Sequence, residues 1–303
     1  MCGKKRLTET QIRNEMSDLI CGRREERDMV NLSEEELRQL QLVELEILVE
    51  VDRICRKNNI NYNITGGTLL GAVRHNGFIP WDDDADVALL RKDYERFKQA
   101  CKIDLDTSRF YYQDAWETEG YRWSYGKVRR KETLYLRENQ DHMPYEQGIS
   151  VDIFPIDDIP ENYIMRFIDN VHCFLIRKFF WSEVGRIDEK NKIKKKIYKL
   201  MSRISRERIL EHYSRLITKR TKENSSKVRV ALMPLSIKKG FGHQKKWYSE
   251  SAEYEFEGHK LYGVRDYDDF LKYVYGDYMK LPPIEKRKYH PASKVILLKN
   301  NRG

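Results

Sequence analysis

The stretch that most limits how this chain can fold lies at residues 65–90 and reads TGGTLLGAVRHNGFIPWDDDADVALL. Gly66 and Gly67 come directly before a segment, Thr68–Arg74, whose residues favour a short helix. Because glycine lacks a Cβ atom, the backbone can turn sharply there and approach an anion, and the amides of the first helical turn would face that anion. We therefore predict a strand end, a glycine turn and a helix that binds phosphate, with Thr68 beside the turn.

Two acids follow this helix at a spacing that puts them on one face of a strand. In an extended chain alternate side chains share a face, so Asp84 and Asp86 point one way while Ala85 and Val87 point the other. Adjacent carboxylates resist joint ionisation unless a cation neutralises them. Hard oxygen ligands suit Mg²⁺ or Mn²⁺. The pattern predicts a metal-dependent phosphoryl-transfer site.

A third acid, Asp152, lies in the apolar segment 148–154, which has the composition of a strand. A carboxylate in a buried strand is costly unless it is paired or bound to a metal. We expect it to join the first two acids. The alternative is a strand-end aspartate that caps the next turn.

Basic residues near these acids are candidates for contact with phosphate. Lys127 and Arg129 share a face of a predicted strand, and cations there would neutralise the charge of a transferred phosphoryl group. Arg74 and His75 lie on the helix that begins at the glycine turn, although His75 in the role of a simple helix cap is an alternative. An ordinary solvated strand face is the alternative for the strand residues, most of all for Arg130.

Together these motifs resemble the signature of the LicD family. Members of this family are phosphotransferases of the nucleotidyltransferase-fold superfamily that move phosphocholine from CDP-choline onto cell-envelope glycans, and fukutin-related ribitol-phosphate transferases are distant relatives. The segments that carry the resemblance are Gly66–Gly71, Arg74-His75, Phe78–Asp86, Lys127–Arg129, Val151–Asp157, Tyr267–Leu271 and Tyr275–Tyr278.

The resemblance implies an α/β (α+β) enzyme with a nucleotidyltransferase-like mixed sheet, flanking helices and a helical, basic C-terminal elaboration. The donor would be CDP-choline or a related CDP-alcohol, and the acceptor a hydroxyl of a glycan such as teichoic acid, lipopolysaccharide or a capsule precursor, in some cases lipid-linked. CMP would leave. The implied site consists of Asp84, Asp86 and Asp152 at the metal, with Asp152 either sharing it or activating the attacking hydroxyl, and of Gly66, Gly67, Thr68, Arg74, His75, Trp81, Lys127 and Arg129 around the substrate.

Composition favours a cytoplasmic enzyme. The chain of 303 residues has no run of about 18 uncharged apolar residues, and its first residues lack the apolar stretch of a secretory signal. Its five cysteines, at positions 2, 21, 55, 101 and 173, are odd in number and form no Cys-x-x-Cys pair. This pattern is typical of reduced thiols rather than a disulfide framework or zinc site.

We divide the chain into a charged leader at 1–32, a catalytic core at 33–160 and an acceptor-side region at 161–303. Ser33 and Glu36 form a capping box that predicts a helix running to about Lys57. Further helices are predicted at 93–102 and 266–275, with a hairpin at 254–264. Strands are predicted at 60–65, 84–90, 109–113, 122–129 and 148–154.

A change of composition marks residues 162–208. One helical face there is apolar, and residues 186–208 then hold ten Lys or Arg against three acids, a balance of +7 within a chain of net charge +9. Either a core helix precedes a solvated basic helix, or this region makes peripheral contact with the anionic inner face of a membrane. The apolar face consists of Ile164, Ile168, Val171, Leu175 and Phe179.

Two other functions share some of these features. A nucleotide-sugar glycosyltransferase also uses an Asp-x-Asp metal site, but its product keeps no donor phosphate. The net positive charge alone would suit a nucleic-acid binder, but that function does not require the acid cluster, so we expect no nucleic-acid partner.

A donor that carries a trimethylammonium group would need aromatic faces around that cation, and the candidates are Trp81, Trp116, Trp123 and Tyr278.

Overall fold

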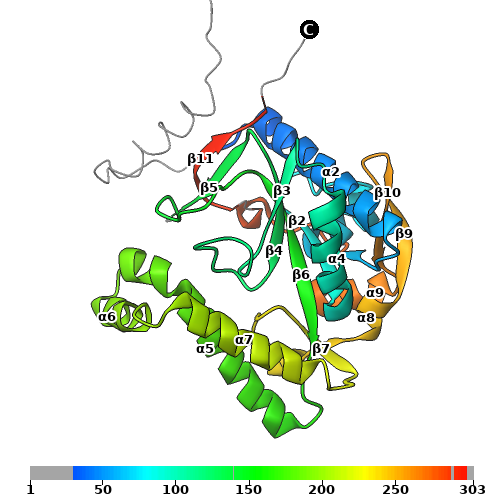
Figure 1. Ribbon diagram of the computed structural model, residues 1–303. Coiled ribbons are helices and arrows are strands. Elements are labelled where there is room, and N and C mark those ends of the chain that lie inside the picture. Colours follow the sequence, from blue (N-terminus) through cyan, green and yellow to red (C-terminus); the bar gives the residue numbers. More distant parts are fainter. Residues whose placement is uncertain (1–29, 139, 288–289, 299–303) are drawn as a thin grey trace, which may run out of the picture.

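A mixed sheet of nine strands forms the centre of the molecule in the computed structural model, which describes residues 30–138, 140–287 and 290–298 (Figure 1). Most of the predicted leader, with Cys2 and Cys21, lies outside the described residues. Seven strands follow the order β3-β4-β6-β2-β1-β10-β9, and β7 pairs with both β6 and β8. The predicted α/β class is confirmed. The strand bounds are β1 Asn63–Ile64, β2 Ala85–Leu90, β3 Phe110–Gln113, β4 Gly126–Arg130, β6 Ser150–Asp158, β7 Lys227–Val230, β8 His243–Gln244, β9 Ser251–Phe256 and β10 His259–Val264.

The register at the centre of the sheet determines where the site lies. Strands β2 and β6 run parallel with Asp86 opposite Asp152, and β4 runs antiparallel to β6 with Lys127 opposite Asp152. Three polar residues that are far apart in the sequence are thereby brought onto adjacent strands. The β2 and β6 positions beside them, such as Val87 and Ile153, are completely buried.

Helix α2 (Glu34–Lys57) covers one face of this sheet and confirms the predicted helix. Ser33 and Glu36 form the predicted capping box, in which the Glu36 backbone N–H donates to Ser33 Oγ over 3.2 Å. The buried stripe includes Leu40, Ile47 and Val51, none of which is exposed. Burying each such side chain contributes roughly 1.5–3 kcal/mol, so α2 is held mainly by its apolar face.

Two shorter helices flank the central strands. Helix α3 (Gly66–His75) begins two residues earlier than the predicted Thr68, because Gly66 adopts a φ of +57° that lets the chain turn directly out of β1. Helix α4 (Arg91–Asp104) contains the predicted 93–102 helix. Both helices pack against β2.

The sheet continues beyond the predicted core at 33–160. The β9–β10 hairpin confirms the prediction at 254–264, and β10 pairs in parallel with β1 through Gly263 and Ile64. Strands β7 and β8, and a separate two-stranded sheet of β5 (Leu134–Arg137) and β11 (Ala292–Ile296), were not predicted. The remaining short elements are α8 Lys246–Ser249, α9 Tyr267–Tyr275, which confirms the predicted helix, η1 Ile237–Lys239 and η2 Ile284–Lys286.

Three helices form a second layer at the lower left of Figure 1: α5 (Tyr163–Asp188), α6 (Lys192–Met201) and α7 (Arg206–Arg220). A smaller apolar cluster joins α5 and α7 to the loop that precedes β4. Buried Asp169 pairs with Arg220 over 2.5 Å and with Arg229 over 3.0 Å, which fixes both helices to β7. Within the described ranges, no helix has the length and apolar character needed to cross a membrane.

Candidate active site

The glycine turn and the acids lie against each other. The Asp86 backbone N–H donates to Thr68 Oγ1 over 2.8 Å, and the Thr65 N–H donates to the Asp86 carbonyl over 3.1 Å. A Cβ atom on Gly66 would lie 3.2 Å from Asp86 Oδ2, and one on Gly67 would lie 2.5 Å from an Asp82 carboxylate oxygen. Only glycine fits Gly67 without a shift of Asp82, so both glycines are needed to bring the start of α3 against the acids.

Burial and mutual repulsion disfavour the charged forms of these acids. Burial, and then the carboxylates of Asp84 and Asp83, raise the pKa of Asp82 to about 7. Burial raises the pKa of Asp86 well above its usual value, and Asp84 and Asp152 raise it further. Burial also raises the pKa of Asp84, although His290 partly offsets this effect. A divalent cation would reverse these shifts.

Asp152 joins this cluster but has a basic partner. Its carboxylate forms a buried ion pair with Lys127 Nζ from the adjacent strand β4. Burial lowers the pKa of Lys127 to about 8, against the opposing effect of Asp152. Lys127 therefore supplies a counter-charge at the acids, and its predicted contact with phosphate stays a prediction.

The residues present suit a hard cation, but their side chains do not form a complete ligand set. Across residues 30–138, 140–287 and 290–298, no group of three or more His, Cys, Asp or Glu side chains is arranged to hold a metal ion. The crowded carboxylates of Asp84 and Asp86 have the donor chemistry for Mg²⁺ or Mn²⁺. The third acid, Asp152, already pairs with Lys127, which is an alternative to a metal ion as its positive partner. The predicted metal triad stays a prediction.

A cavity of about 100 Å³ opens beside the acids. Asp84, Asp152 and Lys127 line it together with Glu44 of α2 and Arg137 of β5. Its other lining residues include Arg129, Trp123, Tyr125 and Tyr135. The cavity therefore carries charges of both signs and several aromatic rings.

Sequence reasoning missed Glu44. Its side chain is 2% exposed, and its Oε2 atom has no hydrogen-bond partner within the described part of the chain. Burial, and then Asp84 and Asp83, raise its pKa well above the usual value. The only available signal was a glutamate on the apolar side of an amphipathic helix, one position from Val43.

Sequence reasoning also missed the residues that hold Asp83. The Tyr135 hydroxyl donates to Asp83 Oδ2 over 2.5 Å, and the His290 N–H donates to the same atom over 2.8 Å. The His290 ring contacts Asp83 Oδ1 at 3.0 Å and Asp84 Oδ2 at 3.4 Å. The hydrogen bond to Asp83 raises the pKa of His290. No local pattern links residues 207 positions apart.

Two predicted substrate residues, Arg74 and Trp81, instead contact the C-terminal segment, and His75 contacts Arg74. Arg74 donates from Nη1 to the Tyr278 carbonyl over 2.7 Å and from Nε to His75 Nε2 over 3.0 Å. The Arg287 guanidinium lies 4.4 Å from the centre of the Trp81 ring. None of Arg74, His75 and Trp81 lines the cavity.

Arg129 lines the cavity, but its guanidinium already has partners. It donates to Gln113 Oε1 over 2.6 Å and to the Gly148 carbonyl over 2.5 Å. These contacts fix β4 to β3 and to the loop before β6. Thr68 is likewise engaged, since its hydroxyl accepts the Asp86 amide.

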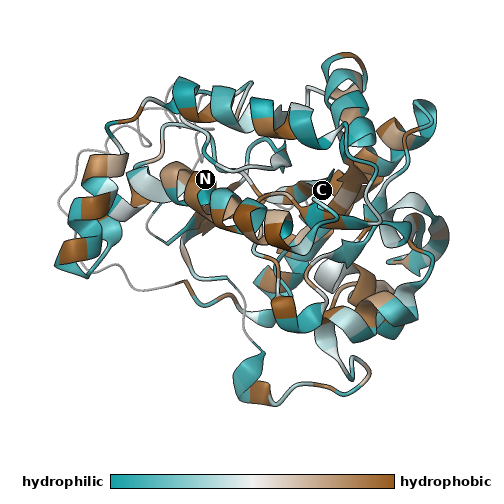
Figure 2. Ribbon diagram, turned by 90° about the horizontal axis from the view of Figure 1, so that it is seen from below, coloured by the Kyte–Doolittle hydropathy of each residue, from teal (hydrophilic) through white to brown (hydrophobic). Residues whose placement is uncertain are grey.

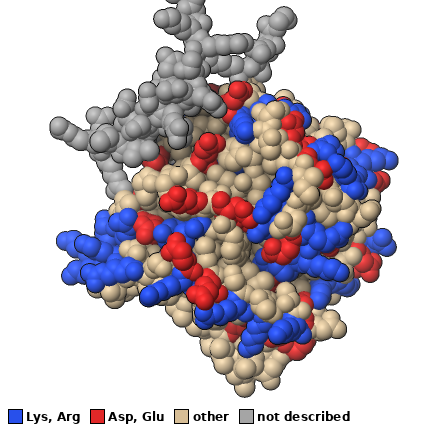
Figure 3. Space-filling view, in the orientation of Figure 1, with Lys and Arg blue, Asp and Glu red and all other residues tan. Residues whose placement is uncertain are grey.

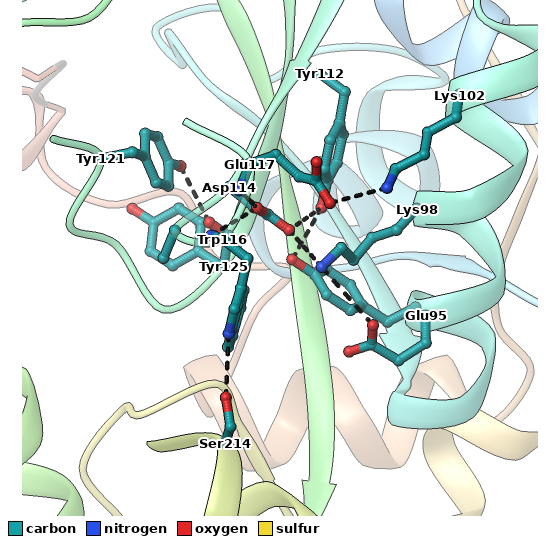
Figure 4. A network of polar contacts seen from close by, with 12 residues as sticks. Glu95, Lys98, Lys102, Tyr112, Asp114, Trp116, Glu117, Tyr121, Tyr125 and Ser214 are labelled. Atoms are coloured by element: carbon teal, nitrogen blue, oxygen red, sulfur yellow. Dashed lines mark hydrogen bonds and ion pairs between the residues drawn. The ribbon is translucent and has the colours of Figure 1, made fainter. Parts of the chain in front are cut away.

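Of the four aromatic candidates, only Trp123 lines the cavity. Trp116 belongs to a network between α4 and α7, in which its indole N–H donates to Ser214 Oγ over 3.1 Å and Lys98 pairs with Asp114 over 2.7 Å (Figure 4). The Tyr278 hydroxyl donates to Asp268 over 2.9 Å.

The segment that carries this site is similar to known proteins. Residues 59–172, which carry the glycine turn and the three acids, match the family model described as the LicD/FKTN/FKRP nucleotidyltransferase domain. The chain is 29% identical over 269 residues to the lipopolysaccharide cholinephosphotransferase LicD of Haemophilus influenzae, which covers 86% of this chain and 98% of that protein. Uncharacterized proteins of Rickettsia typhi and Rickettsia prowazekii are 46% and 44% identical over 54 residues, or 18% of this chain and 18% and 20% of their own.

The mixed sheet, the glycine turn set against the acids and these matches define a phosphotransferase with a nucleotidyltransferase domain. Residues 59–172 are similar to the nucleotidyltransferase domain of the LicD family, and most of the chain is similar to a LicD protein.

Proposed function

We propose that this protein transfers phosphocholine from CDP-choline to a hydroxyl of a cell-envelope glycan, with lipopolysaccharide as the first acceptor to test. The observation that carries the proposal is the contact between the first turn of α3 and the paired acids, next to Asp152 and Lys127. The match along most of both chains to a lipopolysaccharide cholinephosphotransferase supports the choice of donor and acceptor.

Asp84 and Asp86 would hold Mg²⁺ or Mn²⁺, which would neutralise the donor diphosphate when bound. The free amides at the start of α3 would bind a phosphate oxygen, because Gly66 and Gly67 let the donor approach closely. Lys127, which faces Asp152, would compensate the charge that develops during transfer.

In the transfer step, the acceptor hydroxyl oxygen attacks the phosphorus that carries choline. Asp152 takes the hydroxyl proton, a new phosphorus–oxygen bond forms, and the bond to the CMP oxygen breaks. CMP leaves with the electron pair of that bond. Lys127 orients the Asp152 carboxylate through their ion pair.

Product identity tests this function. The protein is incubated with CDP-choline, Mg²⁺ and lipopolysaccharide stripped of phosphocholine, and the products are identified by mass spectrometry. The proposal predicts CMP together with a phosphocholine-bearing glycan. Release of a nucleoside diphosphate from a nucleotide sugar would instead establish a glycosyltransferase. If CMP formed only from CDP-glycerol or CDP-ribitol, the donor would be that CDP-alcohol rather than CDP-choline, and the reaction class would stay the same.

We further propose that α5 and α6 rest on an anionic lipid bilayer, where a lipid-linked acceptor would lie. The apolar stripe predicted on α5 is largely exposed: Ile164 is 68% and Ile168 56% exposed. On α6, Ile193 is 72% and Leu200 63% exposed. In the view from below, brown apolar residues interleave with teal hydrophilic ones along these helices (Figure 2). This exposure favours the membrane over the alternative of a core helix.

The charge of the same region supports an anionic lipid surface as the partner. Lys and Arg side chains gather over α6 at the left edge of the space-filling view (Figure 3). Basic residues next to exposed apolar ones complement an anionic lipid surface, and each contact contributes about 1 kcal/mol. The described helices provide no membrane-crossing segment, so the proposed contact is peripheral.

A further inference from the structure

We propose that the cavity beside the acids binds the phosphocholine end of the donor as a zwitterion, with Glu44 facing the trimethylammonium group and Arg137 facing the phosphate. The inference rests on the proposed function, because it deepens the choice of donor. It assigns a specificity role to a residue that lies outside the matched domain at 59–172.

Glu44 differs from the other buried glutamate of α2. Glu50 is 4% exposed, and its carboxylate pairs with Arg53 over 2.7 Å and accepts the Asp106 N–H over 2.9 Å. Glu44 is 2% exposed and lines the cavity, yet its Oε2 has no partner among the described residues. A buried carboxyl oxygen without a partner is costly, so a cation bound in the cavity would compensate it.

Three aromatic residues in the wall of the cavity suit a quaternary ammonium ion bound beside the acids. Trp123, Tyr125 and Tyr135 line it, and aromatic faces bind such a cation through their negative quadrupole. The volume of about 100 Å³ is small beside the roughly 300–1,000 Å³ of a pocket for a complete drug-sized ligand. The cavity therefore fits one end of a CDP-alcohol and leaves the nucleotide outside.

Arg137 supplies the opposite charge in the same cavity. Within the described ranges its guanidinium makes no hydrogen bond or ion pair inside the usual distance limits, whereas Lys127 pairs with Asp152 and Arg129 with Gln113 and Gly148. The nearby Asp152 and Asp84 carboxylates favour the charged form of Arg137, but a ligand that is only cationic would offer its guanidinium no hydrogen-bond acceptor. A free phosphate would offer Glu44 no cation. A zwitterion satisfies both groups.

The test compares Glu44→Gln with Glu50→Gln, a matched change at a buried glutamate of the same helix. For Glu44→Gln we expect the KM for CDP-choline to rise about tenfold or more, while kcat and the KM for CDP-glycerol, whose alcohol group is uncharged, change less than about twofold. Glu50→Gln should leave the KM for CDP-choline unchanged. Thermal unfolding of both variants checks that each is folded.

A binding measurement separates this inference from the proposed function. Tetramethylammonium chloride is titrated into the full-length protein by calorimetry, with sodium chloride as control. Binding to wild type that is lost in Glu44→Gln supports the cavity assignment even if CDP-choline yields no CMP, a result that would overturn only the proposed function. No binding to wild type, or equal binding to the variant, overturns the inference. A loss of kcat with every donor would also overturn it and indicate a metal-binding or structural role.

Discussion

The acid cluster on the central strands and the α5–α6 surface depart in opposite ways from the usual distribution of polar and apolar side chains. On the central strands β2, β6 and β4, several carboxylates and Lys127 are held in a largely buried site where charge is costly. On α5 and α6, large apolar side chains such as Ile164 and Ile193 lie in solvent. Folded proteins usually contain few buried unpaired charges and few exposed apolar patches. Such departures are typical of sites that bind another molecule. We propose that cations and phosphate complete the first and that lipid completes the second.

The largest effect should come from Asp86→Asn. This change removes one charge from the cluster while keeping the side-chain shape, so the fold should be retained and the melting temperature unchanged or higher. Transfer should fall at least a hundredfold, a loss of about 3 kcal/mol of transition-state stabilisation. The rate of CMP release measures it.

Asp93→Asn, in the first turn of α4, is the matched control and should keep normal activity, because Asp93 pairs with Arg96 away from the cavity. EDTA should imitate Asp86→Asn. Near-normal and EDTA-resistant transfer by Asp86→Asn would show that the buried acids serve structure rather than a metal.

A second prediction concerns the contact between α3 and the acids. Gly67→Ala would place a methyl group 2.5 Å from the Asp82 carboxylate in the observed arrangement, so that carboxylate must move. We expect kcat to fall roughly tenfold, because small displacements of positioned groups are costly in catalysis. Steady-state kinetics with CDP-choline measure the loss.

Adding Asp82→Ala to Gly67→Ala removes the clash. The double variant should therefore lose less activity than the two single changes predict together, which a double-mutant cycle quantifies. Strict additivity would mean that Gly67 and Asp82 act independently.

The third prediction concerns the helical surface. Wild-type protein should sediment with vesicles that contain phosphatidylglycerol at low salt and detach as salt rises. Ile164→Asp combined with Ile193→Asp should weaken this binding several-fold, because each change takes an exposed apolar contact out of the interface. Activity on a detergent-dispersed acceptor should stay the same.

Leu42→Asp, on the exposed side of α2 at 44% exposure, is the matched surface control and should leave vesicle binding unchanged. Equal binding to neutral phosphatidylcholine vesicles, or binding to neither, would contradict the electrostatic contact.

The sequence allowed prediction of the parts of the fold that rest on local patterns. The capping box of Ser33, the glycine turn and the alternation around Asp86 each specify structure within a few residues, and the corresponding elements are confirmed. The short strands β5, β7, β8 and β11 have two to five residues, too few for a periodic signal, and depend on partners elsewhere in the chain.

The same distinction applies to the candidate site. Asp84 and Lys127 could be inferred from strand alternation, and Asp152 from its place in an apolar strand segment; all three line one cavity. Glu44 and His290 reach the acids only through tertiary packing, so their own neighbours in the sequence carry no sign of it. Conversely, Trp116 looked available for a ligand, but its indole N–H is bonded to Ser214.

The smallest effect should come from Ser33→Ala, which tests whether activity merely follows stability. The change removes Ser33 Oγ, which accepts the Glu36 N–H, but keeps the bond from the Ser33 N–H to Glu36 over 2.9 Å. Loss of such a cap costs about 1 kcal/mol, which chemical denaturation measures. Because α2 carries Glu44, a shift in the KM for CDP-choline would mean that loosening the helix is enough to disturb the cavity. An unchanged KM, with lower stability, would assign the effects of Glu44→Gln to the carboxyl group itself.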